Sequence, residues 1–137
     1  IEQPAACKHF GICGGCRYQN LSYEQQLDLK KRQVEELIEK SGLSFAIENI
    51  YGSPITEGYR NKMEFTFGDE EKDGPLALGM HKKNSFYDIV TLEDCRIVDP
   101  DFNVLLQAIL KYFKEKGETL ILSLQHRADW TNLNLSI

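Results

Sequence analysis

Four cysteines constrain this chain more than any other feature, because three of them lie close together and the fourth lies far downstream. Cys7, Cys13 and Cys16 follow the spacing C-x5-C-x2-C, and 78 residues separate Cys16 from Cys95. The segment 7–16, which contains the first three cysteines, is short and rich in glycine, so several sulfur atoms can converge on one point. The fold must bring the fourth sulfur to them. The pattern predicts a four-thiolate site that holds an iron–sulfur cluster or a zinc ion.

Other uses of the cysteines compete with an iron–sulfur site. Disulfides are disfavoured because the sequence shows no signal-peptide pattern, and because 137 residues can bury a core without covalent links. Buried free thiols are disfavoured because three cysteines within ten residues, beside Gly14 and Gly15, make a poor core pattern. Zinc remains open, although zinc sites usually combine two close pairs and this chain has one pair and two single cysteines.

Composition disfavours several classes of protein. A net charge of −5 does not indicate a free-standing nucleic-acid binder, which normally carries a basic footprint. The longest apolar runs, such as Leu120–Leu124, have the length of a strand and not the roughly 20 residues that span a bilayer. We therefore expect no membrane partner. Because the chain starts at Ile1 and not at methionine, we expect a piece of a longer protein.

Hydrophobic periodicity predicts an α+β fold, with an antiparallel β-sheet meander, two helices and an N-terminal cysteine-rich metal loop. Ser22 and Gln25 form a capping-box pattern at the start of the first helix, and Gly42 is a natural stop. Asp99 and Pro100 begin the second helix, whose buried stripe is Phe102, Leu105, Leu106, Ile109, Leu110 and Phe113 and which Gly117 ends. The predicted strands are 46–50, 59–67, 76–81, 86–91, 119–125 and 131–137.

No catalytic set is evident in the sequence. His9, His81 and His126 lie far apart, and no phosphate-binding loop or nucleophile motif is present. The cysteines are better explained as ligands than as nucleophiles. The basic residues around the predicted sheet are open to two interpretations, a patch that contacts phosphate or scattered solvated charges; they are Arg60, Lys62, His81, Lys82 and Lys83.

Several motifs occur in an order that resembles the Fe–S-containing RNA uracil-5-methyltransferases, which make 5-methyluridine in ribosomal RNA (the 23S rRNA type). The resemblance covers roughly residues 5–116 and lapses at 126–130, so we carry nothing over after Gly117. It rests on Cys7–Cys16 followed by Gln19, Leu21, Tyr23, Gln26, Leu27 and Lys30, then on Gly58–Phe65, Leu78–His81 and Asp94–Ile97.

The resemblance implies a cofactor and a place in a larger enzyme. Cys7, Cys13, Cys16 and Cys95 would hold a 4Fe–4S cluster with a structural or RNA-positioning role. Residues 1–20 would be the cluster loop and residues 21–137 a central α+β domain. The S-adenosylmethionine site, the nucleophilic cysteine and the base would belong to a methyltransferase domain absent from this chain.

The same resemblance makes RNA, and ribosomal RNA in particular, the expected partner, in the cytoplasm. Arg60 and Lys62 match the Y-R-x-K strand of the family, and His81 adds a third candidate contact with RNA. No residue of this chain inherits a catalytic role, so we predict that the isolated chain is inactive. Two alternatives remain: a stand-alone iron–sulfur electron-transfer protein and a zinc-bound structural module.

Overall fold

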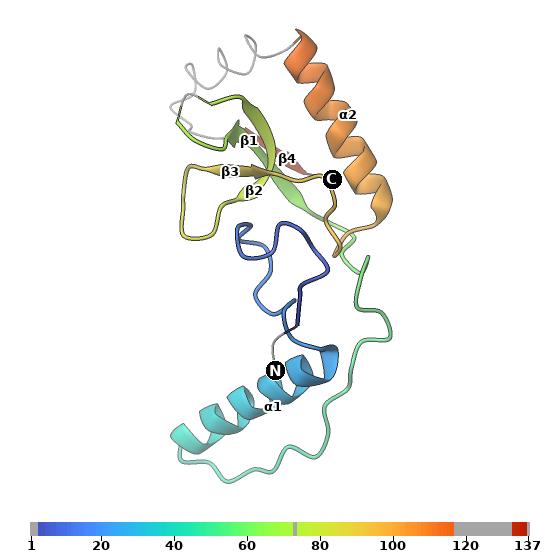
Figure 1. The fold of residues 1–137 in the computed structure, drawn as a ribbon. Helices are drawn as coiled ribbons and strands as arrows, with labels where there is room; N and C mark the ends of the chain where they lie inside the picture. Colours follow the sequence, from blue (N-terminus) through green and yellow to red (C-terminus); the bar gives the residue numbers. More distant parts are fainter. Residues whose placement is uncertain (1–2, 73, 117–132, 137) are drawn as a thin grey trace.

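The structure, a computed structural model, describes residues 3–72, 74–116 and 133–136. Within these ranges, two helices and four strands follow one another as shown in Figure 1. Residues 3–20 contain neither helix nor strand. The elements are α1 (Tyr23–Lys40), β1 (Glu64–Asp69), β2 (Leu76–His81), β3 (Ile89–Thr91), α2 (Pro100–Lys116) and β4 (Leu133–Ser136).

The strands form one antiparallel sheet in the order β3-β2-β1-β4. Thr66 of β1 lies opposite Gly79 of β2, and Met80 of β2 lies opposite Val90 of β3. The predicted α+β class and three-strand meander are confirmed. β4 pairs with the free edge of β1, within the stretch 131–137 that was predicted as a strand.

The core lies between the sheet and α2, which crosses one face of the sheet (Figure 1). Phe65, Leu78 and Leu106 are almost completely buried, and the rings of Phe67 and Phe113 meet edge to face with centroids 5.2 Å apart. The predicted stripe of α2 is correct except for Leu105, which is 43% exposed. One helix on one sheet face is therefore the main source of apolar burial.

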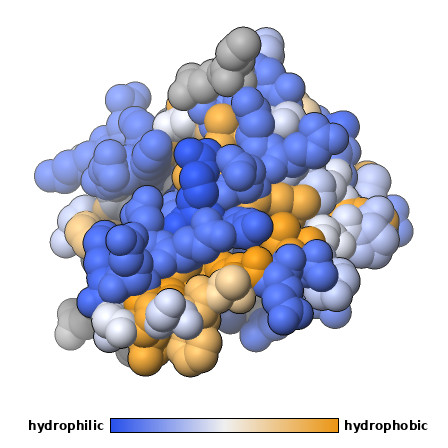
Figure 2. Space-filling view, turned by 90° about the horizontal axis from the view of Figure 1, so that it is seen from below, coloured by the Kyte–Doolittle hydropathy of each residue, from blue (hydrophilic) through white to orange (hydrophobic). Residues whose placement is uncertain are grey.

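α1 begins with the predicted capping box, because the Ser22 hydroxyl accepts from the Gln25 N–H and the Gln25 side chain accepts from the Ser22 N–H. It ends before Gly42, which has a positive φ of 73°. No residue of α1 is buried, and Leu37 on its apolar face is 66% exposed. Figure 2 shows apolar surface between polar side chains on this side of the molecule.

Three predicted strands differ from those observed. Residues 46–50 form neither a helix nor a strand. β1 starts at Glu64 instead of residue 59, because Gly58 and Arg60 donate their N–H groups to the carbonyl oxygens of Arg96 and Ile97. β3 starts at Ile89 instead of residue 86, since Phe86 lies in a bend of the chain and is 86% exposed.

The predicted strand 119–125 and His126 lie outside the described residues. Within the described part of the chain, no helix is long and apolar enough to cross a membrane.

Candidate metal centre

All four cysteines line one cavity between the N-terminal loop and the edge of the sheet. Cys95 is buried, the other three are half-buried, and all are free thiols. The remaining walls are largely apolar and come from both halves of the chain; they include Phe10, Met63, Met80, Leu92 and Ile97. The fold thus brings the distant fourth cysteine to the three clustered ones.

The N-terminal loop is shaped by tight turns and held against β2 by its backbone. His9 O accepts from the N–H groups of Ile12 and Cys13 at 3.2 and 2.9 Å. Gly14 donates to His81 O at 2.9 Å, and a β-carbon at Gly14 would approach the same oxygen to 3.0 Å. The glycine beside Cys13 therefore permits the close approach of the loop to the sheet edge.

Cys95 is held by the first turn of α2. Asn103 Oδ1 accepts from the Cys95 N–H at 2.8 Å, and Asn103 Nδ2 donates to Cys95 O at 3.2 Å. Both backbone groups of this cysteine are therefore paired by one side chain. The sequence analysis did not single out Asn103, because an asparagine in a first helical turn is ordinary.

Polar contacts tie the N-terminal loop to the residues before Cys95. Lys8 and Glu93 form an ion pair, and His9 Nε2 accepts from the Glu93 N–H at 3.3 Å. The bonded Glu93 carboxylate raises the pKa of Lys8, and the ammonium lowers the pKa of Glu93 in return. Burial lowers the pKa of His9, and the charge of Lys8 lowers it further, which favours the neutral ring that accepts this hydrogen bond.

Burial raises the pKa of the Cys13, Cys16 and Cys95 thiols, and the charges of neighbouring cysteines raise it further. Two donors act in the opposite direction: the Gly15 N–H lies 3.3 Å from Cys13 Sγ, and Gln19 Nε2 lies 3.3 Å from Cys16 Sγ. Such donors stabilise a thiolate ligand, whose formation releases a proton when a metal binds.

A single metal ion fits this arrangement poorly. Among the described residues, no three Cys, His, Asp or Glu side chains lie close enough together to hold one ion. Zinc would require all its ligands within about 2.3 Å of one point. A 4Fe–4S cube takes one thiolate per iron and accepts sulfurs spread around a larger body. The four thiols around this cavity would offer one sulfur to each iron of such a cluster.

The three candidate RNA contacts lie outside this cavity. Arg60 and Lys62 precede β1 and His81 ends β2, so the antiparallel pairing puts them toward one end of the sheet. Arg60 donates to Lys62 O at 3.3 Å, while Lys62 pairs with Glu64 at 3.5 Å. His81 is half-buried, and its Nδ1 has no hydrogen-bond partner among the described residues.

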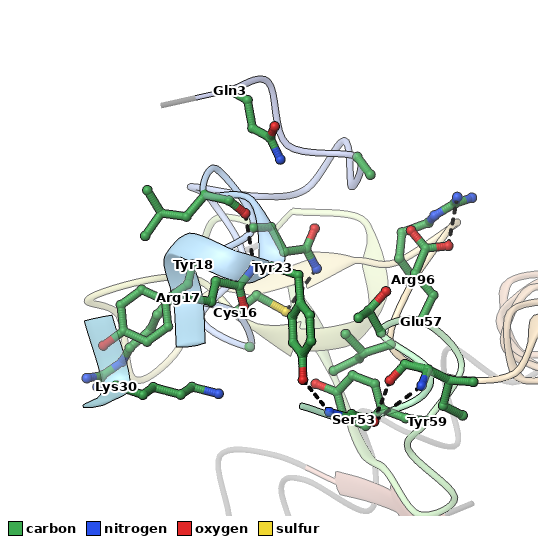
Figure 3. Close-up of a pocket in the computed structure, with 18 of the residues that line it drawn as sticks. Gln3, Cys16, Arg17, Tyr18, Tyr23, Lys30, Ser53, Glu57, Tyr59 and Arg96 are labelled. Carbon is green, nitrogen blue, oxygen red and sulfur yellow. Dashed lines mark hydrogen bonds and ion pairs between the residues drawn. The ribbon is translucent and has the colours of Figure 1, made fainter. Parts of the chain in front are cut away.

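A groove of about 540 Å³ adjoins the cavity, between the N-terminal loop, the start of α1 and residues 53–59 (Figure 3). Cys16, Gln19 and Arg96 line both the groove and the cavity. The sequence analysis did not identify this groove. The sequence feature that could have indicated the groove is the basic–aromatic pair Arg17-Tyr18, which follows Cys16 directly.

The chain is homologous to proteins named uncharacterized RNA methyltransferases. It is 46% identical to the one from Clostridium acetobutylicum over 128 residues, 51% identical to the one from Caldanaerobacter subterraneus over 118 residues and 49% identical to the one from Clostridium tetani over 113 residues. The alignments cover 93%, 85% and 82% of this chain. No protein-family profile matches it.

These relatives are much longer than this chain, which spans 28%, 26% and 25% of their lengths. A relative from Gloeobacter violaceus aligns with 100% of this chain at 34% identity and is covered over 30% of its length. The similarity therefore concerns one part of each of these longer relatives.

Proposed function

We propose that this chain is the central, cluster-bearing part of an S-adenosylmethionine-dependent RNA methyltransferase that acts on C5 of uracil in ribosomal RNA. The observation that carries the proposal is the single apolar cavity lined by Cys7, Cys13, Cys16 and Cys95. Homology to proteins named RNA methyltransferases supports the enzyme class. The uracil target and the cluster rest on the motif resemblance of the cysteine loop and the strand motifs.

In this proposal the four cysteines hold a 4Fe–4S cluster, which supplies a covalent link between residues 1–20 and the end of the sheet region. Methyl transfer needs no change of redox state, so the role of the site is structural. Closing a loop of this length restricts the unfolded chain more than closing a short one. Asn103 and the N–H donors to sulfur hold the ligands in place.

RNA is the proposed partner, and a methyl-donor domain in cis supplies the chemistry. Arg60, Lys62 and His81 are proposed to contact RNA near one end of the sheet. A uracil must be unpaired or turned out of its helix before C5 can meet a methyl donor. We propose no catalytic residue in this chain, and its S-adenosylmethionine site would lie in the other domain, in a cytoplasmic enzyme.

Iron and acid-labile sulfide content of anaerobically purified protein tests the cluster. We expect about four irons and four sulfides per chain, with a broad visible absorption, and loss of both in Cys95→Ser. Ile97→Val is the matched control, because it alters the same cavity wall and keeps all four sulfurs. Zinc at about one per chain without sulfide would replace the cluster with a structural zinc site.

Incubation with S-adenosylmethionine and ribosomal RNA tests whether the methyl-transfer reaction takes place outside this chain. We expect no methyl incorporation by the chain alone, because the nucleophile and the methyl-donor site lie elsewhere. Incorporation at a level above a no-protein control would overturn the assignment to a non-catalytic domain. A reversible redox potential coupled to electron transfer with a partner protein would favour the electron-transfer alternative.

A further inference from the structure

The groove beside the metal centre carries three kinds of groups that protein surfaces use to bind single-stranded nucleic acid. Aromatic rings, unpaired cations and buried polar atoms without partners meet in one hollow (Figure 3). Its walls come from parts of the chain that the sequence separates: the loop around Cys16, the first turns of α1 and residues 53–59.

Three tyrosines line the groove: Tyr18, Tyr23 and Tyr59. The Tyr23 hydroxyl accepts from the Ser53 N–H. This bond ties the ring at the start of α1 to the segment 53–59. Tyr59 is 53% exposed, so much of its side chain is open to a ligand. Exposed tyrosine rings are the platforms on which unpaired bases stack.

Two cations of the groove are free of carboxylates. Arg17 and Lys30 are both exposed, and neither forms an ion pair with any described residue. In Figure 3 they lie toward one end of the groove with Tyr18, whereas Arg96 at the other end is already paired with Glu57 at 3.0 Å. The free end is therefore suited to a phosphate, despite the acidic total charge.

Two buried polar atoms in the shared wall lack partners among the described residues. They are Gln19 Oε1, which is an acceptor, and Arg96 Nε, which is a donor. A buried polar atom without a partner is costly to leave unpaired. Unpaired bases present N–H groups and acceptors on their edges, which is how proteins read single-stranded RNA.

We propose that this groove binds one unpaired nucleotide of RNA. The base stacks on the tyrosine rings, an N–H of its edge donates to Gln19 Oε1, and a neighbouring phosphate lies at Arg17 and Lys30. The inference rests on the proposed RNA-binding function and adds a site that Arg60, Lys62 and His81 do not describe.

Gln19 connects this groove to the metal centre. Its amide N–H contacts Cys16 Sγ at 3.3 Å, while its oxygen is buried in the wall of the groove and has no partner among the described residues. A nucleotide that binds the oxygen therefore changes the surroundings of a sulfur ligand. The visible spectrum of the iron-loaded protein should shift when RNA binds, and Gln19→Ala should lose most of that shift.

The test uses iron-loaded protein and a fluorescently labelled, uridine-rich single-stranded RNA of about ten nucleotides. Anisotropy gives the dissociation constant. Loss of base stacking in Tyr59→Ala should weaken binding by about 5- to 150-fold. Arg17→Ala with Lys30→Ala should weaken it and lower the salt dependence by about 1.4 logarithmic units per logarithmic unit of salt. Arg32→Ala and Lys40→Ala, on α1 outside the groove, are the matched controls and should stay within about twofold of the unsubstituted chain.

If the control pair, Arg32→Ala with Lys40→Ala, weakened RNA binding as much as the groove pair, the groove would not be the binding site, although RNA binding itself would stand. Photo-cross-links of 5-iodouridine RNA only to peptides outside the groove walls, which are residues 3–6, 15–30, 53–59 and 96–97, would do the same. No binding by iron-loaded protein would instead overturn the proposed RNA function. If Tyr59→Ala loses iron, Tyr59→Leu and the two cation variants decide the question, because they keep the apolar wall or alter only exposed side chains.

Discussion

The side chain of Asn103 pairs with both backbone groups of Cys95, accepting from its N–H at 2.8 Å and donating to its carbonyl at 3.2 Å. Asn103 lies in the first turn of α2, the helix that covers the sheet. The helix α2 therefore has two roles. Its apolar stripe forms part of the core, and its first turn fixes Cys95, the cysteine that lies far from the other three in the sequence. Core packing and the position of Cys95 in the candidate metal centre are linked through this residue.

Replacing Asn103 by alanine leaves both backbone groups of Cys95 without their partner. We expect the free energy of unfolding to fall by about 1–3 kcal/mol, the cost of unpairing a buried polar group. Urea unfolding followed by circular dichroism measures this change. Lys111→Ala, on the exposed face of the same helix, is the control and should change the midpoint little. Equal midpoints for the two variants would contradict the importance of the contact.

Adjacent leucines of α2 provide a matched pair for the core. Leu106 is 1% exposed and Leu105 is 43% exposed. Leu106→Ala should lower the free energy of unfolding by about 2–5 kcal/mol, because it removes apolar burial and leaves a cavity. Leu105→Ala should cost much less. Chemical denaturation of both variants checks this order, and the reverse order would mean that α2 is rotated about its axis.

Gly79 is expected to tolerate no side chain. A β-carbon there would overlap the carbonyl oxygen of Val90 and approach Leu92 N to 2.9 Å, and backbone atoms of a paired strand cannot move aside cheaply. Gly79→Ala should disrupt the pairing of β2 with β3 and yield little folded protein. Gly42→Ala is the comparison, since Gly42 has a positive φ but open space around it and should cost about 1–2 kcal/mol. A Gly79→Ala protein as stable as Gly42→Ala would contradict this register.

Ser22→Ala removes the hydroxyl that caps α1 and should weaken the helix start by about 1 kcal/mol. Because α1 contributes no buried residue, we expect the loss to be local. Amide hydrogen exchange should accelerate in the first turn of α1 and remain unchanged in α2. Ser44→Ala, at an exposed position beyond the helix, serves as the control. Faster exchange in both helices would show that they unfold as one unit.

Local signals account for the elements that were predicted well. The capping box of Ser22 and Gln25, the Asp99-Pro100 start of α2 and the alternation in 76–81 each act within a few residues, so the sequence contains them directly. The start of β1 was misplaced because Gly58 and Arg60 pair with residues nearly 40 positions away. Alternation of side chains cannot reveal which backbone a strand-like segment will meet.

The same distinction applies to the site. Cysteine spacing alone grouped Cys7, Cys13 and Cys16, and the structure places Cys95 in the same cavity. That the four bind a metal remains a prediction. Gln19, Asn103 and the groove cations depend on which loops the fold brings together, and no periodicity marks them. It remains a prediction that RNA contacts Arg60, Lys62 and His81.

The 78 residues between Cys16 and Cys95 also set an order of events during synthesis. At about 5–20 residues per second, the ribosome takes roughly 4–16 seconds after Cys16 to add Cys95. During that interval three thiols are already made, while the partner that completes the cavity does not exist. The proposed cluster, if it needs all four thiols, would therefore be inserted after Cys95 emerges, and the delivery of iron would be a late step in maturation.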